Sequence, residues 1–250
     1  MAVIFDSEHT LRKAVQVGVS LMPSLDADAD KEKLVDFARV VRASDAKLFN
    51  KYSLNTNAPN GLRAVLLFER DVPLRGVGQV HHAPLAVFPN SMEVGLIYRL
   101  PEAKTLEIDG QDYPDDTGFP KLVRTVLRHF WDKITHVDIV RIGKVYEYLY
   151  GPFDSEDALN WLLANFVREP KAKKAVAANA FLLFQEGGMN MNLSVSSGVM
   201  PHGSVIQIKL DINNADITSK LQINNFDTIM TAANEFHKGG FQDILKETTK

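Results

Sequence analysis

The sequence predicts an α+β fold made of two consecutive β-α-β-β-β-α units, related by pseudo-twofold symmetry. We expect antiparallel sheets with the helices on one face. Apolar and polar residues alternate in strand-like segments, helix-like apolar stripes interrupt them, and both occur in the same order in each half of the 250-residue chain. Groups of strands followed by a single helix favour antiparallel pairing. The composition, 45% hydrophobic and 24% charged, is typical of a globular protein.

The first predicted unit covers residues 1–134. It begins with a strand whose buried face is Val15, Val17, Val19 and Leu21. A helix is predicted at 30–43, because apolar residues fall there at the i, i+3, i+4 and i+7 positions of one stripe. Further strands are predicted at 63–69, 76–88, 92–100 and 105–108. Pro120 then opens a helix that closes the unit.

The second predicted unit covers residues 135–250, either as a separate domain or as half of one composite domain. A strand is predicted at 137–150, ended by Gly151-Pro152. Asp154 or Ser155 is expected to cap the next helix. Three strands follow at 180–186, 190–196 and 205–212. The last helix carries the stripe Phe226, Ile229, Met230 and Ala233.

Composition excludes several classes of protein. The chain has no cysteine, which rules out disulfide scaffolds, Cys-ligated zinc, iron–sulfur clusters and thiol catalysis. A net charge of −3 argues against a protein whose main task is to coat nucleic acid. Gly76-Val77-Gly78 lacks the third glycine of a dinucleotide-binding loop, so no cofactor is expected. The first residues do not form a signal peptide, and we expect a cytoplasmic protein.

The strand at 137–150 carries the main candidate for a ligand site. Tyr146, Tyr148 and Tyr150 fall on one face, and Arg141 and Lys144 lie nearby. Such a row of tyrosines with two cations is able to stack bases or sugars, or to bind a peptide. The alternative is an amphipathic wall between sheet and helix. Gly143 is expected to mark a bulge in this strand.

Two other clusters of polar residues are candidates for a functional site. His136 and Asp138 are two residues apart at a predicted strand start, where a shared face would make them a base with its orienting carboxylate or a pair of metal ligands. The alternative is a solvent-facing polar pair. Asp26, Asp28 and Asp30 resemble a calcium loop but lack its glycine and glutamate, so an acidic helix start is preferred and no metal is expected.

Short motifs in the second half resemble a sporadically distributed, uncharacterised prokaryotic protein family with an Arg-Ile-Gly-x-x-Tyr strand in mid-chain. Arg141-Ile142-Gly143 and Tyr146 match that strand, and Leu210-Asp211-Ile212 matches a later one. The chain differs at Lys144-Val145-Tyr146-Glu147, where the family shows Arg-Tyr-Ile-Asn. The resemblance implies length and layout, and it supplies no catalytic residue.

We therefore expect a non-catalytic binding or assembly protein that acts through a partner protein or by self-association. Unpaired edge strands would favour such association. One alternative is a nucleic-acid-associated module that uses the tyrosine strand and the basic segment 171–174. A second alternative is a metal-dependent hydrolase centred on His136 and Asp138.

Overall fold

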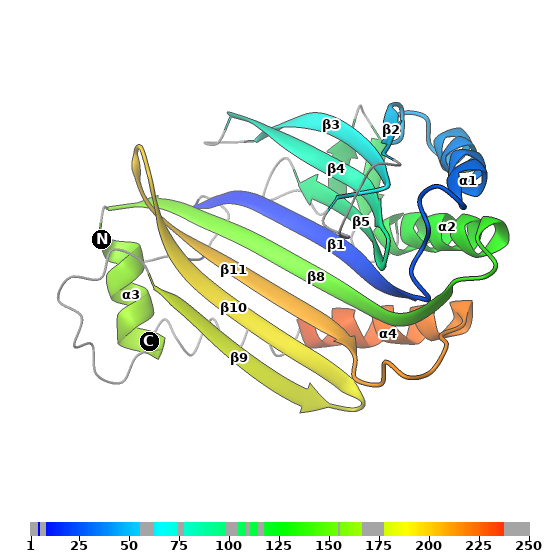
Figure 1. Cartoon of the computed structure of the whole chain (residues 1–250). Helices are drawn as coiled ribbons and strands as arrows, with labels where there is room; N and C mark the ends of the chain where they lie inside the picture. The colour runs from blue at the N-terminus through cyan, green and yellow to red at the C-terminus, as the bar shows by residue number, and fades with distance from the viewer. Residues whose placement is uncertain are drawn as a thin grey trace.

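A computed structural model describes most of the chain. The described residues are 5, 9–55, 63–74, 78–98, 105–108, 111–114, 118–154, 156–166 and 178–237. They form eleven strands and four helices, and nine of the strands build one antiparallel sheet (Figure 1). The mixed α+β class predicted from the sequence is confirmed.

The first half of the chain supplies five strands and two helices to this assembly. Its elements are β1 Thr10–Met22, α1 Lys31–Ser44, β2 Tyr52–Leu54, β3 Leu66–Leu74, β4 Gly78–Phe88, β5 Ser91–Tyr98 and α2 Gly118–Lys133. A separate two-stranded sheet is formed by β6 Thr105–Ile108 and β7 Gln111–Pro114. From the outer edge inward, the strand order is β2-β3-β4-β5-β1.

The second half continues the same sheet. Its elements are β8 Asp138–Phe153, α3 Asp157–Phe166, β9 Asn179–Glu186, β10 Met189–Met200, β11 Gly203–Asn214 and α4 Ile223–Phe236. From the centre outward, the strand order is β8-β11-β10-β9. The two halves meet where β1 pairs antiparallel with β8, with Gly18 opposite Gly143 near the middle. One sheet therefore runs through both predicted units.

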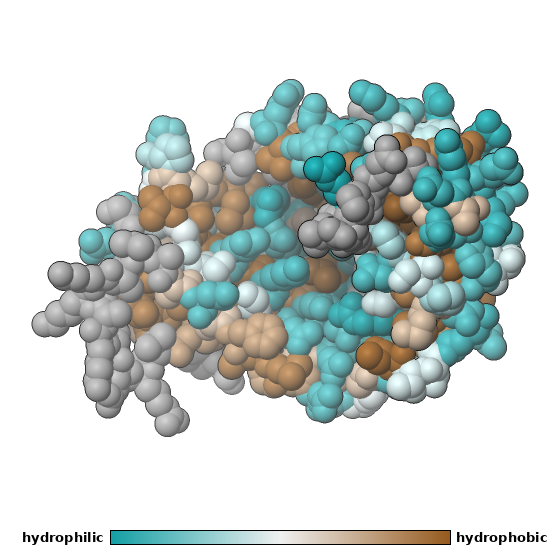
Figure 2. Space-filling model, viewed as in Figure 1, coloured by the Kyte–Doolittle hydropathy of each residue, from teal (hydrophilic) through white to brown (hydrophobic). Residues whose placement is uncertain are grey.

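One face of the sheet packs against helices and the other is open. Val15 and Val17 of β1 are 1% exposed and belong to one core cluster with the buried stripes of all four helices. Residues between them, such as Gln16 and Gly18, lie on the open face, as the period of two requires. We call these the helix face and the open face. Polar side chains occupy the middle of the view in Figure 2, over β1, β8 and β11.

Three details differ from the sequence-based expectation. Strand β8 continues through Gly151-Pro152 to Phe153, which lies opposite Ser204. A register shift between Ser204 and Ile206 accommodates the proline, which has no N–H to give to the ladder. The short strands β2 and β7 were not predicted.

No helix among the described residues combines the length and the apolar character that a membrane crossing requires.

Candidate functional site

The two outer strands of the sheet differ in what they leave exposed. Strand β2 has three residues and covers the edge of β3, where Tyr52 lies opposite Phe68 and Leu54 opposite Leu66. Phe68 and Leu66 are fully buried. At the other end, β9 has eight residues, and no described strand pairs with its outer side. Its backbone N–H and C=O groups there are a ready template for another strand.

Strand β9 is also the most apolar exposed segment of the described chain. Phe181 is 62% exposed, Leu183 is 59% exposed, and Leu182 and Phe184 are each 39% exposed. The neighbouring β10 shows the contrast, because its apolar residue Leu193 is only 2% exposed. Four consecutive large apolar side chains on an open edge form the kind of patch that marks an interaction surface.

These side chains project from both faces of the sheet. Leu182 and Phe184 share the helix face with Leu193, which lies directly opposite Leu182 on β10. Phe181 and Leu183 lie on the open face. In Figure 2 apolar side chains gather along the lower border of the molecule, over β9. A strand added beyond β9 would therefore meet apolar groups above and below the sheet plane.

The local sequence explains why the edge is so regular. Gly187 and Gly188 have φ angles of 57° and 77° and form a two-residue turn to β10, which suits glycine at both central positions. All eight β9 residues then pair with β10 without a register shift. Asn179 to Gln185 contains no charged residue and no proline. Charged residues and proline, which block edge pairing in monomeric sheet proteins, are thus missing from residues 179–185 of this strand.

The predicted tyrosine site has a different role from the one expected. Tyr146, Tyr148 and Tyr150 do share one face of β8, but it is the helix face, where they are 1%, 7% and 6% exposed. Lys144, on the same face, is fully buried. The burial of these rings argues against a row on which bases stack, and ligand binding at this strand stays a prediction. The rings form a wall between sheet and helix, but the hydroxyls of Tyr146 and Tyr148 are bonded inside the protein and do not reach solvent as that alternative expects.

This buried face fixes helix α4 to the sheet. Asn234 Oδ1 accepts hydrogen bonds from Lys144 Nζ at 2.7 Å and from the Tyr146 hydroxyl at 2.8 Å. His237 stacks on the Tyr146 ring with centroids 3.8 Å apart, and its Nε2 lies 2.6 Å from the Tyr148 hydroxyl. The polar tips of these side chains are therefore bonded within the protein, as buried polar groups must be.

Arg141 lies apart from the tyrosines. It points to the open face, where its guanidinium pairs with Asp211 at 3.0 Å. Gly143 permits this arrangement, because a Cβ there would lie 2.9 Å from Cβ of Asn213 and 3.1 Å from Asp211 Oδ1. The bulge expected at Gly143 is instead a register shift around Val140. Arg141 and Lys144 thus do not form one cationic site.

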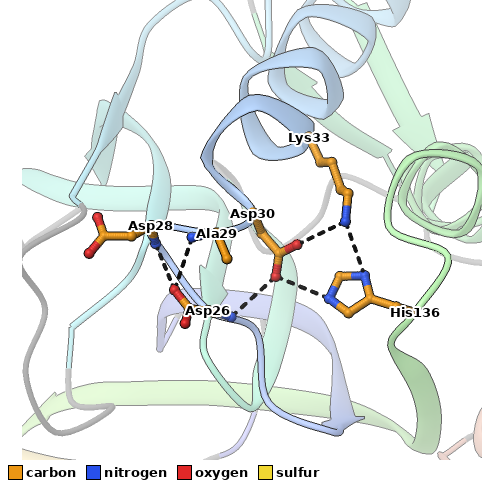
Figure 3. Close-up of polar contacts among 6 residues, drawn as sticks. All are labelled: Asp26, Asp28, Ala29, Asp30, Lys33 and His136. Carbon is orange, nitrogen blue, oxygen red and sulfur yellow. Dashed lines mark hydrogen bonds and ion pairs between the residues drawn. The ribbon is translucent and has the colours of Figure 1, made fainter.

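His136 and Asp138 also do not act together. His136 lies in a turn before β8, and its Nε2 is 3.1 Å from Oδ2 of Asp30, whose side chain is 4% exposed (Figure 3). Lys33 Nζ lies 3.1 Å from the other Asp30 oxygen and 3.4 Å from His136 Nδ1. Asp138 pairs with Lys220 instead.

The contacts of His136 decide its role. A lysine ammonium only donates hydrogen bonds, so His136 Nδ1 accepts from Lys33 and Nε2–H donates to Asp30. Both ring nitrogens are then used, and neither is left for a metal ion or a substrate proton. The cluster ties the start of α1 to the turn between α2 and β8. Among the described residues, no group of His, Asp and Glu is arranged to hold a metal ion.

A strand at 180–186 is predicted from the sequence, but no functional site is predicted on that strand. The signal was available, since Phe181-Leu182-Leu183-Phe184 is apolar without alternation and Gly187-Gly188 follows two residues later. The basic segment 171–174 lies outside the described residues. No family model matches the sequence, and comparison with curated proteins and with solved structures gives no match either.

Proposed function

We propose that this chain is a binding or assembly protein whose partner is a second copy of itself, joined edge to edge through β9. The observation that carries the proposal is the outer side of β9, with which no described strand pairs and where Phe181 and Leu183 are more than half exposed. Adding a strand there extends the sheet, satisfies backbone groups and removes apolar side chains from water. A partner of opposite charge is not favoured, because β9 carries no charge before Glu186.

Symmetry limits the registers that such a pair can adopt. When two identical antiparallel strands are related by a twofold axis, one residue lies opposite its own copy, and facing side chains project to the same side. With Leu182 on the axis, Phe181 lies opposite Leu183 of the second copy, and Ala180 lies opposite Phe184. Every apolar side chain of the edge then has an apolar partner across the interface.

The neighbouring register is less favourable. With Leu183 on the axis, Phe181 would lie opposite Gln185, and Ala180 would lie opposite Glu186. Leu182 would still face Phe184, but these two pairs place polar or charged groups beside apolar ones, and the packing of Phe181 against Leu183 is lost. We therefore expect the Leu182-centred pair.

We also propose that the two halves are copies of one β-α-β-β-β-α unit. Support comes from the strand orders β1-β5-β4-β3 and β8-β11-β10-β9, which match when the chain is divided between α2 and β8. The antiparallel β1–β8 pair, with Gly18 opposite Gly143, is where a pseudo-twofold axis would pass. The units would then be residues 1–134 and 135–250, and the resemblance to the prokaryotic family concerns the second.

The test is a charge placed on each edge in turn. Leu183→Lys puts an ammonium on β9 at a side chain that is 59% exposed, so the fold is retained. Ser53→Lys puts the same charge on β2, the opposite edge of the same sheet. In sedimentation equilibrium we expect a dimer for the unchanged protein and for Ser53→Lys, and association weakened at least about tenfold for Leu183→Lys. A monomeric unchanged protein, or a dimer that is insensitive to Leu183→Lys, would overturn the proposal.

A further inference from the structure

An opening in the sheet lies between β4 and β5. These strands pair only where Leu85–Phe88 faces Ser91–Val94. Beyond Val94, β5 continues to pair with β1, whereas the described part of β4 continues to pair with β3. The two neighbours therefore separate. A cavity of about 240 Å³ occupies the space between them, above β1 and β8 on the open face.

One side chain bridges the opening. His82 of β4 places its Nε2 2.8 Å from the carbonyl oxygen of Gly95 on β5. Burial lowers the pKa of His82 to about 4, so the ring is neutral near pH 7. A neutral ring that donates from Nε2–H to a carbonyl carries its lone pair on Nδ1. His82, a residue of the cavity lining, therefore bridges the two strands without adding a charge near pH 7.

Charged side chains of both signs line the cavity. Glu93 lies on its wall, and its carboxylate forms no hydrogen bond or ion pair with another described side chain. Glu147 lies on the floor, where its carboxylate pairs with Arg12 and thereby occupies the one arginine of the lining. Gln16 adds an amide beside Gly95. The basic side chains of the lining are engaged elsewhere, since Arg12 pairs with Glu147 and His81 pairs with Glu69 and Asp71. Glu93 is therefore the charged group left for a ligand.

The remaining walls are apolar and small. Ala14 and Val80 pack with the buried pair Val72 and Ile97 in a satellite cluster separate from the main core. Ala14 and Ile97 both line the cavity. A short aliphatic body fits against this surface, and the volume admits a molecule of about ten non-hydrogen atoms. The lining thus combines one available carboxylate with an apolar wall.

We propose that this cavity binds a small organic cation, with an ammonium or guanidinium group paired to Glu93 and a short aliphatic body against Ala14 and Ile97. A carboxylate ligand is disfavoured because it would face the carboxylates of Glu93 and Glu147. Charge-assisted hydrogen bonds from the ligand to Glu93 supply most of the specificity. This binding does not depend on association through β9, because none of these side chains belongs to that strand.

The probe is agmatine, which has a guanidinium and an ammonium at the ends of a four-carbon chain. Glutarate, of similar length and opposite charge, is the control ligand. Calorimetric titration of the full-length protein is expected to show agmatine binding and no glutarate binding. Glu93→Gln, which keeps the shape of the side chain, is expected to weaken agmatine binding about tenfold or more.

Two further variants keep the test decisive. Asp36→Asn removes an exposed carboxylate from α1 and should leave agmatine binding unchanged. Gln16→Glu adds a carboxylate to the cavity wall and should tighten binding. Circular dichroism of each variant checks that the fold is retained. Lack of agmatine binding by the unchanged protein, equal binding by Glu93→Gln, or preferred binding of glutarate would each overturn the proposal.

Discussion

The two halves of the sheet have the same strand order but differ in how far their inner strands pair and in whether a described strand covers the outer edge. In the first half, β4 and β5 pair over four residues and then separate around a cavity, and β2 covers the outer edge. In the second half, β10 and β11 pair over their whole length, from Met189–Asn214 to Met200–Gly203, and no described strand pairs with the outer edge of β9. In our proposals, the interrupted ladder leaves room for a small ligand, and the complete ladder presents an edge for association.

The largest expected difference is between two phenylalanines, one near each outer edge of the sheet. Phe68 of β3 is fully buried beneath Tyr52 of the covering strand, with ring centroids 5.3 Å apart. Phe68→Ala should lower the free energy of unfolding by about 3–5 kcal/mol, since it removes transfer energy and leaves a cavity. Phe181→Ala, at a side chain that is 62% exposed, should change that energy by less than about 0.5 kcal/mol while weakening the dimer.

Urea unfolding measured at a fixed low protein concentration, together with sedimentation, separates the two effects. Equal destabilisation by Phe68→Ala and Phe181→Ala would mean that β9 is covered in the folded protomer, and the contrast between the edges would fail.

The adjacent histidines of β4 should respond to pH in opposite directions. Burial lowers the pKa of His82 to about 4 from an ordinary value of 6.5. Its contribution to stability is therefore fully present above pH 6.5 and is lost as pH falls toward 4, by about 3 kcal/mol. Hydrogen bonds to Glu69 and then Asp71 raise the pKa of the exposed His81. The contribution of His81 to stability is smaller than that of His82; it is present below pH 6.5 and is lost as pH rises.

Urea unfolding of His82→Gln and His81→Gln between pH 4 and 8, each compared with the unchanged protein, measures both contributions. The His82 difference should grow with pH and level off above 6.5. A His82 difference that is flat with pH would show that the ring is not held neutral in the folded state.

The glycine pair at the junction of the halves provides a third, smaller contrast. Gly18 and Gly143 face each other across β1 and β8. A Cβ on Gly143 would lie 2.9 Å from Asn213, whereas a Cβ on Gly18 would meet nothing within 4 Å. Gly143→Ala should therefore cost about 1–3 kcal/mol of folding free energy. Gly18→Ala should be neutral or stabilise by up to about 1 kcal/mol.

Thermal and urea unfolding of these two variants measures both changes in folding free energy. If both alanines cost the same, the tight packing of Asp211 and Asn213 over β8 is not what requires glycine at Gly143.

Much of the fold could be predicted because most strands bury only one face. Met191, Leu193 and Val195 alternate with polar residues, and this period of two identifies β10 and its buried side. Strand β8 was harder, since Tyr146 and Tyr148 are amphipathic and periodicity does not say whether such a face meets helix or water. The three-residue β2 is too short to produce a periodic signal.

The candidate sites could be predicted less well, for physical reasons. The Asp30–His136 contact joins residues that are 106 positions apart, and only the folded chain brings them together. The cavity beside His82 depends on where β4 leaves β5, which no local pattern encodes. The β9 edge was the exception, because four apolar residues without alternation, next to Gly187-Gly188, already indicate a strand that is apolar on both faces.

Self-association through β9 is tested most directly by a single engineered cysteine, because the chain has none of its own. In the Leu182-centred pair, the Cα atoms of Leu182 and its copy would lie about 4.5–5.5 Å apart, within the range of a disulfide. The two copies of Gln185 would be about 20 Å apart. We predict that Leu182→Cys forms a covalent dimer rapidly under mild oxidation and that Gln185→Cys does not. Equal, slow cross-linking of both variants, or faster cross-linking of Gln185→Cys, would contradict the proposed pairing.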